Sequence, residues 1–251
     1  MIYAMACADG RYIPVAKFQL ETAIKKGKVN RTIFYNLDEI DDQFKEKNKE
    51  ILNAGGERRK GCYLWKPYFI NKAISQIEYG DYLIYLDGAG CYYRSSVSET
   101  VGFMEKHNIE ILGSRNGNYY EKEWTKRDVF VKLQCDVPEY AEQFQCYAGF
   151  LMLKKTARTI KFVQQWLRYC QEYNLITDCP NQMGKDNYEG FVEHRHDQSI
   201  LSLLMAKEEV PYVEKLPIPN FFIYHHSLNT SIKDIKKMKR VAIWEKVKKH
   251  E

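Results

Sequence analysis

Residues 81–93 read DYLIYLDGAGCYY, in which five apolar or aromatic residues lie between Asp81 and Asp87. A continuous apolar run of this length is typical of a buried strand. Asp87 stands at its carboxyl end, and Gly88 and Gly90 allow the backbone to pass close to a ligand. Ligands of parallel α/β sheets bind outside the carboxyl ends of the strands, which makes Asp87 a candidate site residue. The alternative is an ordinary Asp-Gly turn.

Elements on both sides of this strand alternate in type. Apolar runs predict further strands at 2–8, 32–36, 110–113, 147–153, 211–216 and 221–224. Helical spacing predicts helices at 13–26, 40–53, 68–77, 95–107, 157–173, 197–206 and 231–249. This alternation predicts an α/β fold, a mainly parallel sheet sandwiched by helices. Residues 114–144 are polar and poorly periodic, so we expect a functional loop with a short helix there.

Size, cysteines and the N-terminal sequence narrow the class of protein. The 251 residues suit one domain over 1–231 and a basic amphipathic helix over 232–251. Seven scattered cysteines form no CxxC pair, which argues against a zinc knuckle and for reduced thiols in the cytoplasm. The opening MIYAMACADGRYIP meets Asp9 and Arg11 early, so we expect no secretory signal, and no run is long enough for a membrane span.

The positive charge is concentrated in the last twenty residues. Residues 232–251 hold eight Lys or Arg and three acids, which accounts for the net charge of +5. A nucleic-acid groove would spread positive charge over the binding face, so we expect no nucleic-acid partner for the body of the chain. The basic segment either lies peripherally on an anionic membrane, suited to a lipid-linked acceptor, or packs on the domain with a solvated face.

Two polar segments could carry chemistry. RRKGCYLWKPY (58–68) places basic residues before a helix, where the helix dipole favours anions, and Lys66 is the candidate for a phosphate ligand. The alternative is a solvated basic loop. EHRHDQS (193–199) packs two histidines, two acids and an arginine into seven residues, but its spacing does not fit HExxH. Asp197 is either a helix N-cap or a functional carboxylate.

Three weaker signals complete the candidates. His225 and His226 follow a late strand and could reach a metal held by Asp87, or could be surface residues. Asp128 lies in the loop WTKRD, and Gly149 precedes an apolar strand, where its lack of a side chain could leave space for a sugar ring.

Together these segments resemble the GT-A-type glycosyltransferases of polysaccharide and surface-glycan biosynthesis in bacteria and large algal viruses. The resemblance runs in order through YLWKPYFINKAI (63–74), GDYLIYLDGAG (80–90), WTKRDVF (124–130), YAGFLMLKKT (147–156) and EHRHDQSILSLL (193–204). It implies a GT-A-like (Rossmann-like) fold, a nucleotide-sugar donor with UDP as the commonest nucleotide, a divalent Mn²⁺ or Mg²⁺, and a glycan or lipid-linked acceptor.

The resemblance also implies roles for single residues. Donor-binding positions are Ala6, Asp9, Arg11, Lys66, Asp87, Gly88 and Ala89; acceptor-binding positions are Gly149, His196, Asp197 and Gln198; metal ligands are Asp87, His225 and His226. Asp87 matches the first Asp of the DxD metal motif, but Ala89 stands at its third position. Either a histidine such as His225 or His226 completes the site, or metal dependence is weak.

The implied reaction needs two kinds of group. The cation and Lys66 would neutralise the leaving nucleoside diphosphate. Asp197 or Asp128 would take the acceptor proton if the reaction inverts the sugar configuration. Two rivals stay open. A nucleotidyltransferase should carry a Gly-rich basic loop after the first strand, of which Asp9-Gly10-Arg11 is a faint version. A nucleotide-sugar-binding module without turnover would also tolerate the incomplete DxD.

Overall fold

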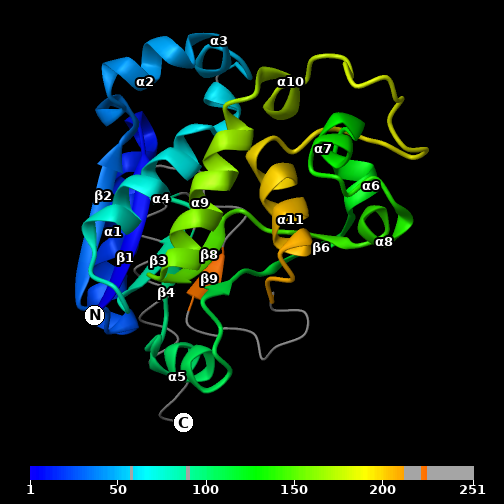
Figure 1. Cartoon of the computed structure of the whole chain (residues 1–251). Coiled ribbons are helices and arrows are strands. Elements are labelled where there is room, and N and C mark those ends of the chain that lie inside the picture. Colours follow the sequence, from blue (N-terminus) through cyan, green and yellow to red (C-terminus); the bar gives the residue numbers. More distant parts are fainter. Residues whose placement is uncertain (57–58, 89–90, 212–221, 225–251) are drawn as a thin grey trace.

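A five-stranded sheet runs through the computed structural model of the chain, which describes residues 1–56, 59–88, 91–211 and 222–224 (Figure 1). The strand order is β2-β1-β3-β8-β5. The bounds are β1 Ile2–Ala8, β2 Arg31–Asn36, β3 Tyr82–Leu86, β5 Ile111–Leu112 and β8 Phe150–Lys154. β2 and β3 pair parallel with β1, whereas β8 runs antiparallel to β3 and to β5. The predicted α/β class with a mainly parallel sheet is confirmed.

Helices cover both faces of the sheet. Alternate residues of a strand point to opposite faces, and β1 shows this by dividing its side chains between two cores. Its alanines Ala4, Ala6 and Ala8 belong to the core under α1 (Ile13–Thr22) and α5 (Ser98–Lys106). Its larger residues Tyr3, Met5 and Cys7 belong to the core under α4 (Trp65–Gln76), α9 (Ala157–Cys170) and α11 (Asp197–Lys207).

Helix α9 connects the sheet with α11. Its start is fixed by Thr156, whose side chain accepts a hydrogen bond from the backbone N–H of Thr159, while the Thr159 hydroxyl accepts one from Thr156 N–H. The completely buried Trp166 donates from its indole N–H to the carbonyl of Asp197 at 3.0 Å. A buried indole needs such a partner, so this bond fixes the position where α11 begins.

Several predicted elements have shifted ends. The helix predicted over 40–53 is divided into α2 (Asp42–Lys47) and α3 (Lys49–Leu52), because Asn48 between them leaves the helical conformation at φ −113° and ψ 22°. The helix predicted from Tyr68 starts earlier, and Pro67 lies in its first turn, where a missing N–H costs nothing. The long helix predicted over 157–173 ends at Cys170, and the short α10 (Tyr173–Ile176) follows.

The polar stretch 114–144 is more structured than predicted. It contains β6 (Arg115–Tyr120), α6 (Glu121–Trp124), α7 (Arg127–Lys132), α8 (Pro138–Ala141) and the start of β7 (Phe144–Cys146). β6 and β7 pair antiparallel as a separate two-stranded sheet. A second such pair joins β4 (Cys91–Tyr93) to β9 (Phe222–Tyr224).

Some predictions fall outside the described residues: Ala89, His225, His226, most of the strand at 211–216 and the helix over 232–251. Within the described part, six cysteines are free thiols. No described helix is long and apolar enough to cross a membrane.

Candidate active site

The carboxyl ends of the parallel strands bring acidic residues to one edge of the sheet. Asp9 follows β1 and Asp87 follows β3. The backbone around Asp87 is held on both sides: its N–H donates to the carbonyl of Gly149 at 2.9 Å, and the Gln19 side-chain amide donates to its carbonyl at 2.7 Å. Gly88 allows close approach, because a Cβ there would lie 2.7 Å from the Cys7 carbonyl oxygen.

Lys66, Asp87 and Asp197 form a charged triad from three different elements. Lys66 Nζ lies 3.3 Å from Asp87 Oδ1 and 3.2 Å from Asp197 Oδ2. The exposed fractions of the side chains are 6% for Lys66, 2% for Asp197 and 29% for Asp87. Asp87 is therefore the member that a ligand can touch, and the other two lie behind it.

Burial and pairing act in opposite directions on these groups. Burial alone would lower the pKa of Lys66, but Asp197 and Asp87 outweigh it and raise that pKa above its usual value. Burial raises the pKa of Asp197 to about 6, although Lys66 opposes the shift. Lys66 is therefore a permanent cation, whereas Asp197 can change its charge just below neutral pH.

Aromatic rings enclose the ammonium group of Lys66. Its Nζ lies 5.4 Å from the ring centre of Tyr63, 5.8 Å from that of Tyr85 and 5.9 Å from that of Trp65. Such ring faces attract a cation. The Tyr85 hydroxyl also donates to Asp87 Oδ1 at 2.7 Å. The Asp87 side chain is 29% exposed, so part of its carboxylate is open to a ligand.

Strained backbone lies on both sides of the triad. Gly61, Cys62 and Tyr63 have φ of 61°, 48° and 61° in succession, just before α4. His196, directly before Asp197, has φ 54° and ψ −120°. Left-handed conformations at residues other than glycine cost free energy and gather at functional sites. The strain therefore supports a functional assignment of this edge.

The two histidines of EHRHDQS are structural, neutral groups. Because a carbonyl only accepts, His194 donates from Nε2 to Leu175 O and His196 donates from Nδ1 to Ile176 O, both at 2.8 Å. Burial lowers the pKa of both rings. The histidines thus tie the start of α11 to α10. Their second nitrogens face other groups of the protein, Lys126 N–H for His194 and Arg59 for His196.

Gln198 links α11 to the segment around Gly149. Its side-chain oxygen accepts from Ala148 N–H at 3.2 Å, and its amide donates to Gln145 Oε1 at 2.9 Å. Since Gly149 in turn accepts from Asp87 N–H, the segments AGF, YLDG and HDQ meet at the triad.

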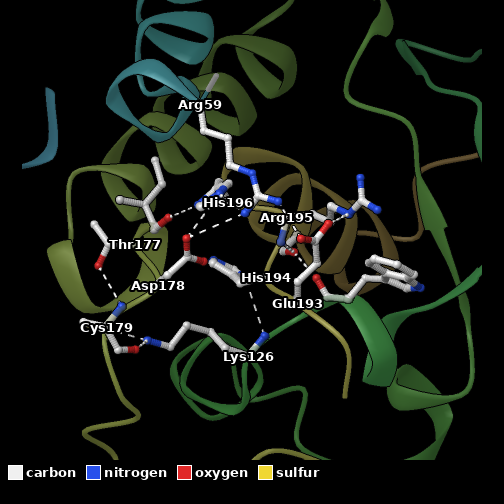
Figure 2. A network of polar contacts seen from close by, with 12 residues as sticks. Arg59, Lys126, Thr177, Asp178, Cys179, Glu193, His194, Arg195 and His196 are labelled. Atoms are coloured by element: carbon white, nitrogen blue, oxygen red, sulfur yellow. Dashed lines mark hydrogen bonds and ion pairs between the residues drawn. The ribbon is translucent and has the colours of Figure 1, made fainter. Parts of the chain in front are cut away.

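A small polar cavity, here the Arg59 pocket, lies beside His194 (Figure 2). Its volume is about 240 Å³, and its lining includes Arg59, Asp178, Asn181, Asn187, Phe191 and Glu193. Figure 2 shows Arg59 extending between two acids: it pairs with Glu193 and lies 3.7 Å from Asp178. The exposed fractions of Asp178 and Glu193 are 55% and 33%, so both carboxylates face solvent.

A second cavity, here the Trp65 pocket, lies between α2, α3 and the turn before α4. Its volume is about 400 Å³, and its lining includes Trp65, Lys45, Lys49, Lys60 and Asp38. Lys60 Nζ donates to Asp9 Oδ2 at 2.7 Å, which connects this pocket to the carboxyl end of β1. The pocket thus combines an aromatic face with several ammonium groups.

The remaining predicted residues lie elsewhere. Ala6 is completely buried in the core, so we remove it from the donor-binding residues. Asp128 is also buried, and its two oxygens accept from the backbone N–H groups of Gln182 and Met183, so it anchors a loop instead of meeting an acceptor. Arg11 is exposed, and its guanidinium contacts Tyr12.

Arg59, Tyr63, Asp178 and Tyr85 were not among the predicted site residues. Tyr85 could have been found, because it lies two residues before Asp87 on the same side of the strand. Nothing in the local sequence connects Asp178 with Arg59, since only the folded chain brings them together.

The described residues do not fit a divalent metal site. No group of three or more His, Cys, Asp or Glu side chains converges anywhere in the part of the chain that the structure describes. Asp87 Oδ1 already accepts from Tyr85 and faces Lys66, and the second carboxylate, that of Asp197, is buried and also faces Lys66. Mn²⁺ and Mg²⁺ need several oxygen ligands at once.

Comparisons with known proteins give only distant likenesses. No family model and no curated protein matches the sequence. Among solved structures, mouse xyloside xylosyltransferase 1 is 12% identical, covers 85% of this chain and 84% of its own, and has a TM-score of 0.46. The glycosyltransferase GlyE of Streptococcus pneumoniae is 11% identical, with 84% of this chain and 44% of that chain covered and a TM-score of 0.43.

A different enzyme class also occurs among these structures. A putative glucose-1-phosphate thymidylyltransferase from Bacillus anthracis is 8% identical, covers 96% of this chain and 95% of its own, and has a TM-score of 0.42. Likeness at this level assigns no function, because one fold carries many activities.

Proposed function

We propose that this protein is a glycosyltransferase, which moves a sugar from a nucleotide-sugar donor to a hydroxyl acceptor. The observation that carries the proposal is Asp87. It lies at the carboxyl edge of the parallel strands, is partly exposed, and is held by Lys66, Tyr85 and the Gly149 carbonyl. A fixed carboxylate at this edge suits a donor whose sugar and ribose hydroxyls need acceptors.

The Trp65 pocket is the candidate site for the donor nucleotide. Trp65 offers a face on which a base can stack, and Lys45, Lys49 and Lys60 offer charge to a diphosphate. UDP is the first nucleotide to test, because UDP donors are commonest in the family that the sequence resembles. Lys66 itself does not reach the phosphates in this arrangement, since it is enclosed between acids and rings.

The Arg59 pocket is the candidate site for the acceptor. Sugar hydroxyls both donate and accept, and this pocket presents a guanidinium, two carboxylates, two amides and the ring of Phe191. The exposed acids Asp178 and Glu193 are better placed than Asp128 to take a proton from an acceptor hydroxyl, because Asp128 is buried and fully hydrogen-bonded. The acceptor is then a glycan or a lipid-linked sugar.

The proposal is tested by turnover of the wild-type protein and Asp87→Asn. With a panel of nucleotide sugars and simple glycosides, release of nucleoside diphosphate should identify one donor. Asp87→Asn should reduce this rate by about 10²–10³-fold, a loss typical when one electrostatic contact to a transition state is removed. Glu99→Gln, which changes an exposed acid on α5, serves as the control and should keep the rate.

Two outcomes would contradict the proposal. Wild-type turnover that survives in Asp87→Asn would place the chemistry elsewhere. Release of pyrophosphate from a nucleoside triphosphate and a sugar 1-phosphate, without transfer from any nucleotide sugar, would favour the nucleotidyltransferase alternative.

A further inference from the structure

The Lys66 ammonium lies between two carboxylates, a position that normally holds a cation. Asp87 comes from the end of β3 and Asp197 from the start of α11, and their oxygens approach one point from different elements. Each oxygen lies within 3.3 Å of Lys66 Nζ. Buried carboxylates need such a counter-charge, because an unpaired buried charge is strongly destabilising.

The surroundings of Lys66 are built to keep the ammonium in place. Its side chain is 6% exposed, and the rings of Tyr63, Trp65 and Tyr85 lie around the charge. The left-handed backbone at Cys62 and Tyr63 leads directly into the first turn of α4, which carries Lys66. Lysine suits the position, since its ammonium is a compact point charge with three hydrogen-bond donors.

We propose that the Lys66 ammonium is a built-in substitute for a divalent cation at this site. It lies between Asp87 and Asp197, where it balances one of their two negative charges without Mn²⁺ or Mg²⁺. Ala89 fits this arrangement in sequence, since it offers no carboxylate where the DxD pattern has its second acid. The part of the inference that concerns nucleotide binding rests on the proposed function, whereas the part that concerns metal binding does not.

The direct test is Mn²⁺ binding, measured by electron paramagnetic resonance on the intact protein without any nucleotide. Wild type should bind Mn²⁺ weakly. Lys66→Met keeps the length of the side chain but removes its charge, leaving two carboxylates without a cation, and should bind Mn²⁺ at least about tenfold more tightly. The double variant Lys66→Met/Asp87→Asn should lose this gain, because one of the two ligands is gone.

A matched control is Lys155→Met. Lys155 is another buried lysine, but its Nζ donates to the carbonyls of Ser75 and Ile77 and not to acids. Its replacement should therefore create no Mn²⁺ site. Lys66→Arg keeps the positive charge and should bind Mn²⁺ as weakly as wild type.

One result would overturn the inference: a wild-type protein that binds one Mn²⁺ as tightly as Lys66→Met, with an affinity that Asp87→Asn abolishes. If Lys66→Met does not fold, stoichiometric binding of one Mn²⁺ by wild type that Asp87→Asn abolishes overturns the inference by itself. A second measurement uses the thermal shift caused by UDP, which should be equal in excess Mn²⁺ and in excess chelator. A shift that needs Mn²⁺ would contradict the inference that Lys66 takes the place of the divalent cation. No shift by any nucleotide would count against the proposed function alone.

Discussion

Asp197 contacts the Lys66 ammonium at 3.2 Å, and we expect its charge state to affect the position of Lys66. Its pKa is raised to about 6 by burial, against the attraction of Lys66. Because this pKa is higher in the folded than in the unfolded state, ionisation of Asp197 lowers the stability of the fold as pH rises from about 4 to about 6. When Asp197 is ionised, the Lys66 ammonium nevertheless has a carboxylate on each side, that of Asp87 and that of Asp197.

The pH profile of turnover tests this role. In wild type, kcat/KM should fall below about pH 6, because a protonated Asp197 leaves Lys66 paired with Asp87 alone. Asp197→Asn should give a reduced rate that does not change between pH 5 and 7. A variant with the same acid limb as wild type would show that another group titrates.

Residue 88 must be small, because the backbone directly after Asp87 passes close to Cys7 and Ala16. In Gly88→Ala the new Cβ would lie 2.7 Å from the Cys7 carbonyl oxygen and 3.1 Å from Ala16 Cβ, so the backbone must shift. We expect a loss of about 1–3 kcal/mol in the free energy of unfolding, measured by urea denaturation, together with lower turnover.

Gly102→Ala is the matched control for this substitution. Gly102 lies inside α5, and a Cβ there meets nothing within 4 Å. Alanine should stabilise the helix by about 0.5–1 kcal/mol. A Gly88→Ala protein as stable and active as Gly102→Ala would refute the packing argument.

At the scale of elements, α6, β7 and α11 share one buried polar network. Glu121, the first residue of α6, accepts from Thr125 Oγ1 at 2.7 Å and from Gln145 Nε2 at 3.3 Å, both at Oε2. Its Oε1 has no hydrogen bond within the part of the chain that the structure describes. Burial raises the pKa of Glu121 to about 7, although hydrogen bonds to the charged form oppose the shift.

Glu121→Gln should therefore change the pH dependence of stability. A raised carboxyl pKa means that wild type loses stability as pH rises from about 4.5 to about 7. Glutamine does not titrate, so the free energy of unfolding of the variant relative to wild type should increase by about 2 kcal/mol between pH 5.5 and 8.5. Urea denaturation at both values measures this difference. The exposed Glu50→Gln should show no such increase, and a parallel pH dependence in Glu121→Gln and wild type would contradict the burial argument.

Elements with strong local signals could be predicted from sequence, and contacts between distant segments could not. β1, β3 and β8 are buried apolar runs, and their strand periodicity places Asp87 correctly at a strand end. β6 reads RNGNYY and has no buried residue, so it shows no apolar pattern, and the sequence predicts a loop there. The sequence predicts Lys66 as a phosphate ligand, but only the folded chain brings it between Asp87, after β3, and Asp197, at the start of α11.

At the scale of the whole molecule, the two pockets and the triad lie against different elements. The Trp65 pocket lies against α2 and α3, the triad joins the sheet to α4 and α11, and the Arg59 pocket lies beside α10 and the segment before α11. Under the proposed function, donor and acceptor would occupy separate pockets, and transfer would require both to be held near Asp87.

A nucleotide that binds the Trp65 pocket should stabilise the folded chain, because a ligand that binds the native state and not the unfolded state shifts the equilibrium towards the native state. At about 100 times its dissociation constant, a ligand adds about 2.7 kcal/mol, which for a chain of this size corresponds to a Tm increase of about 5–10 °C. A thermal-shift screen of nucleoside diphosphates should identify one base. Trp65→Ala should weaken the shift by removing the stacking face, whereas Trp124→Ala changes a tryptophan that does not line the pocket and should leave the shift in place. An equal loss in both variants would mean that the nucleotide binds elsewhere.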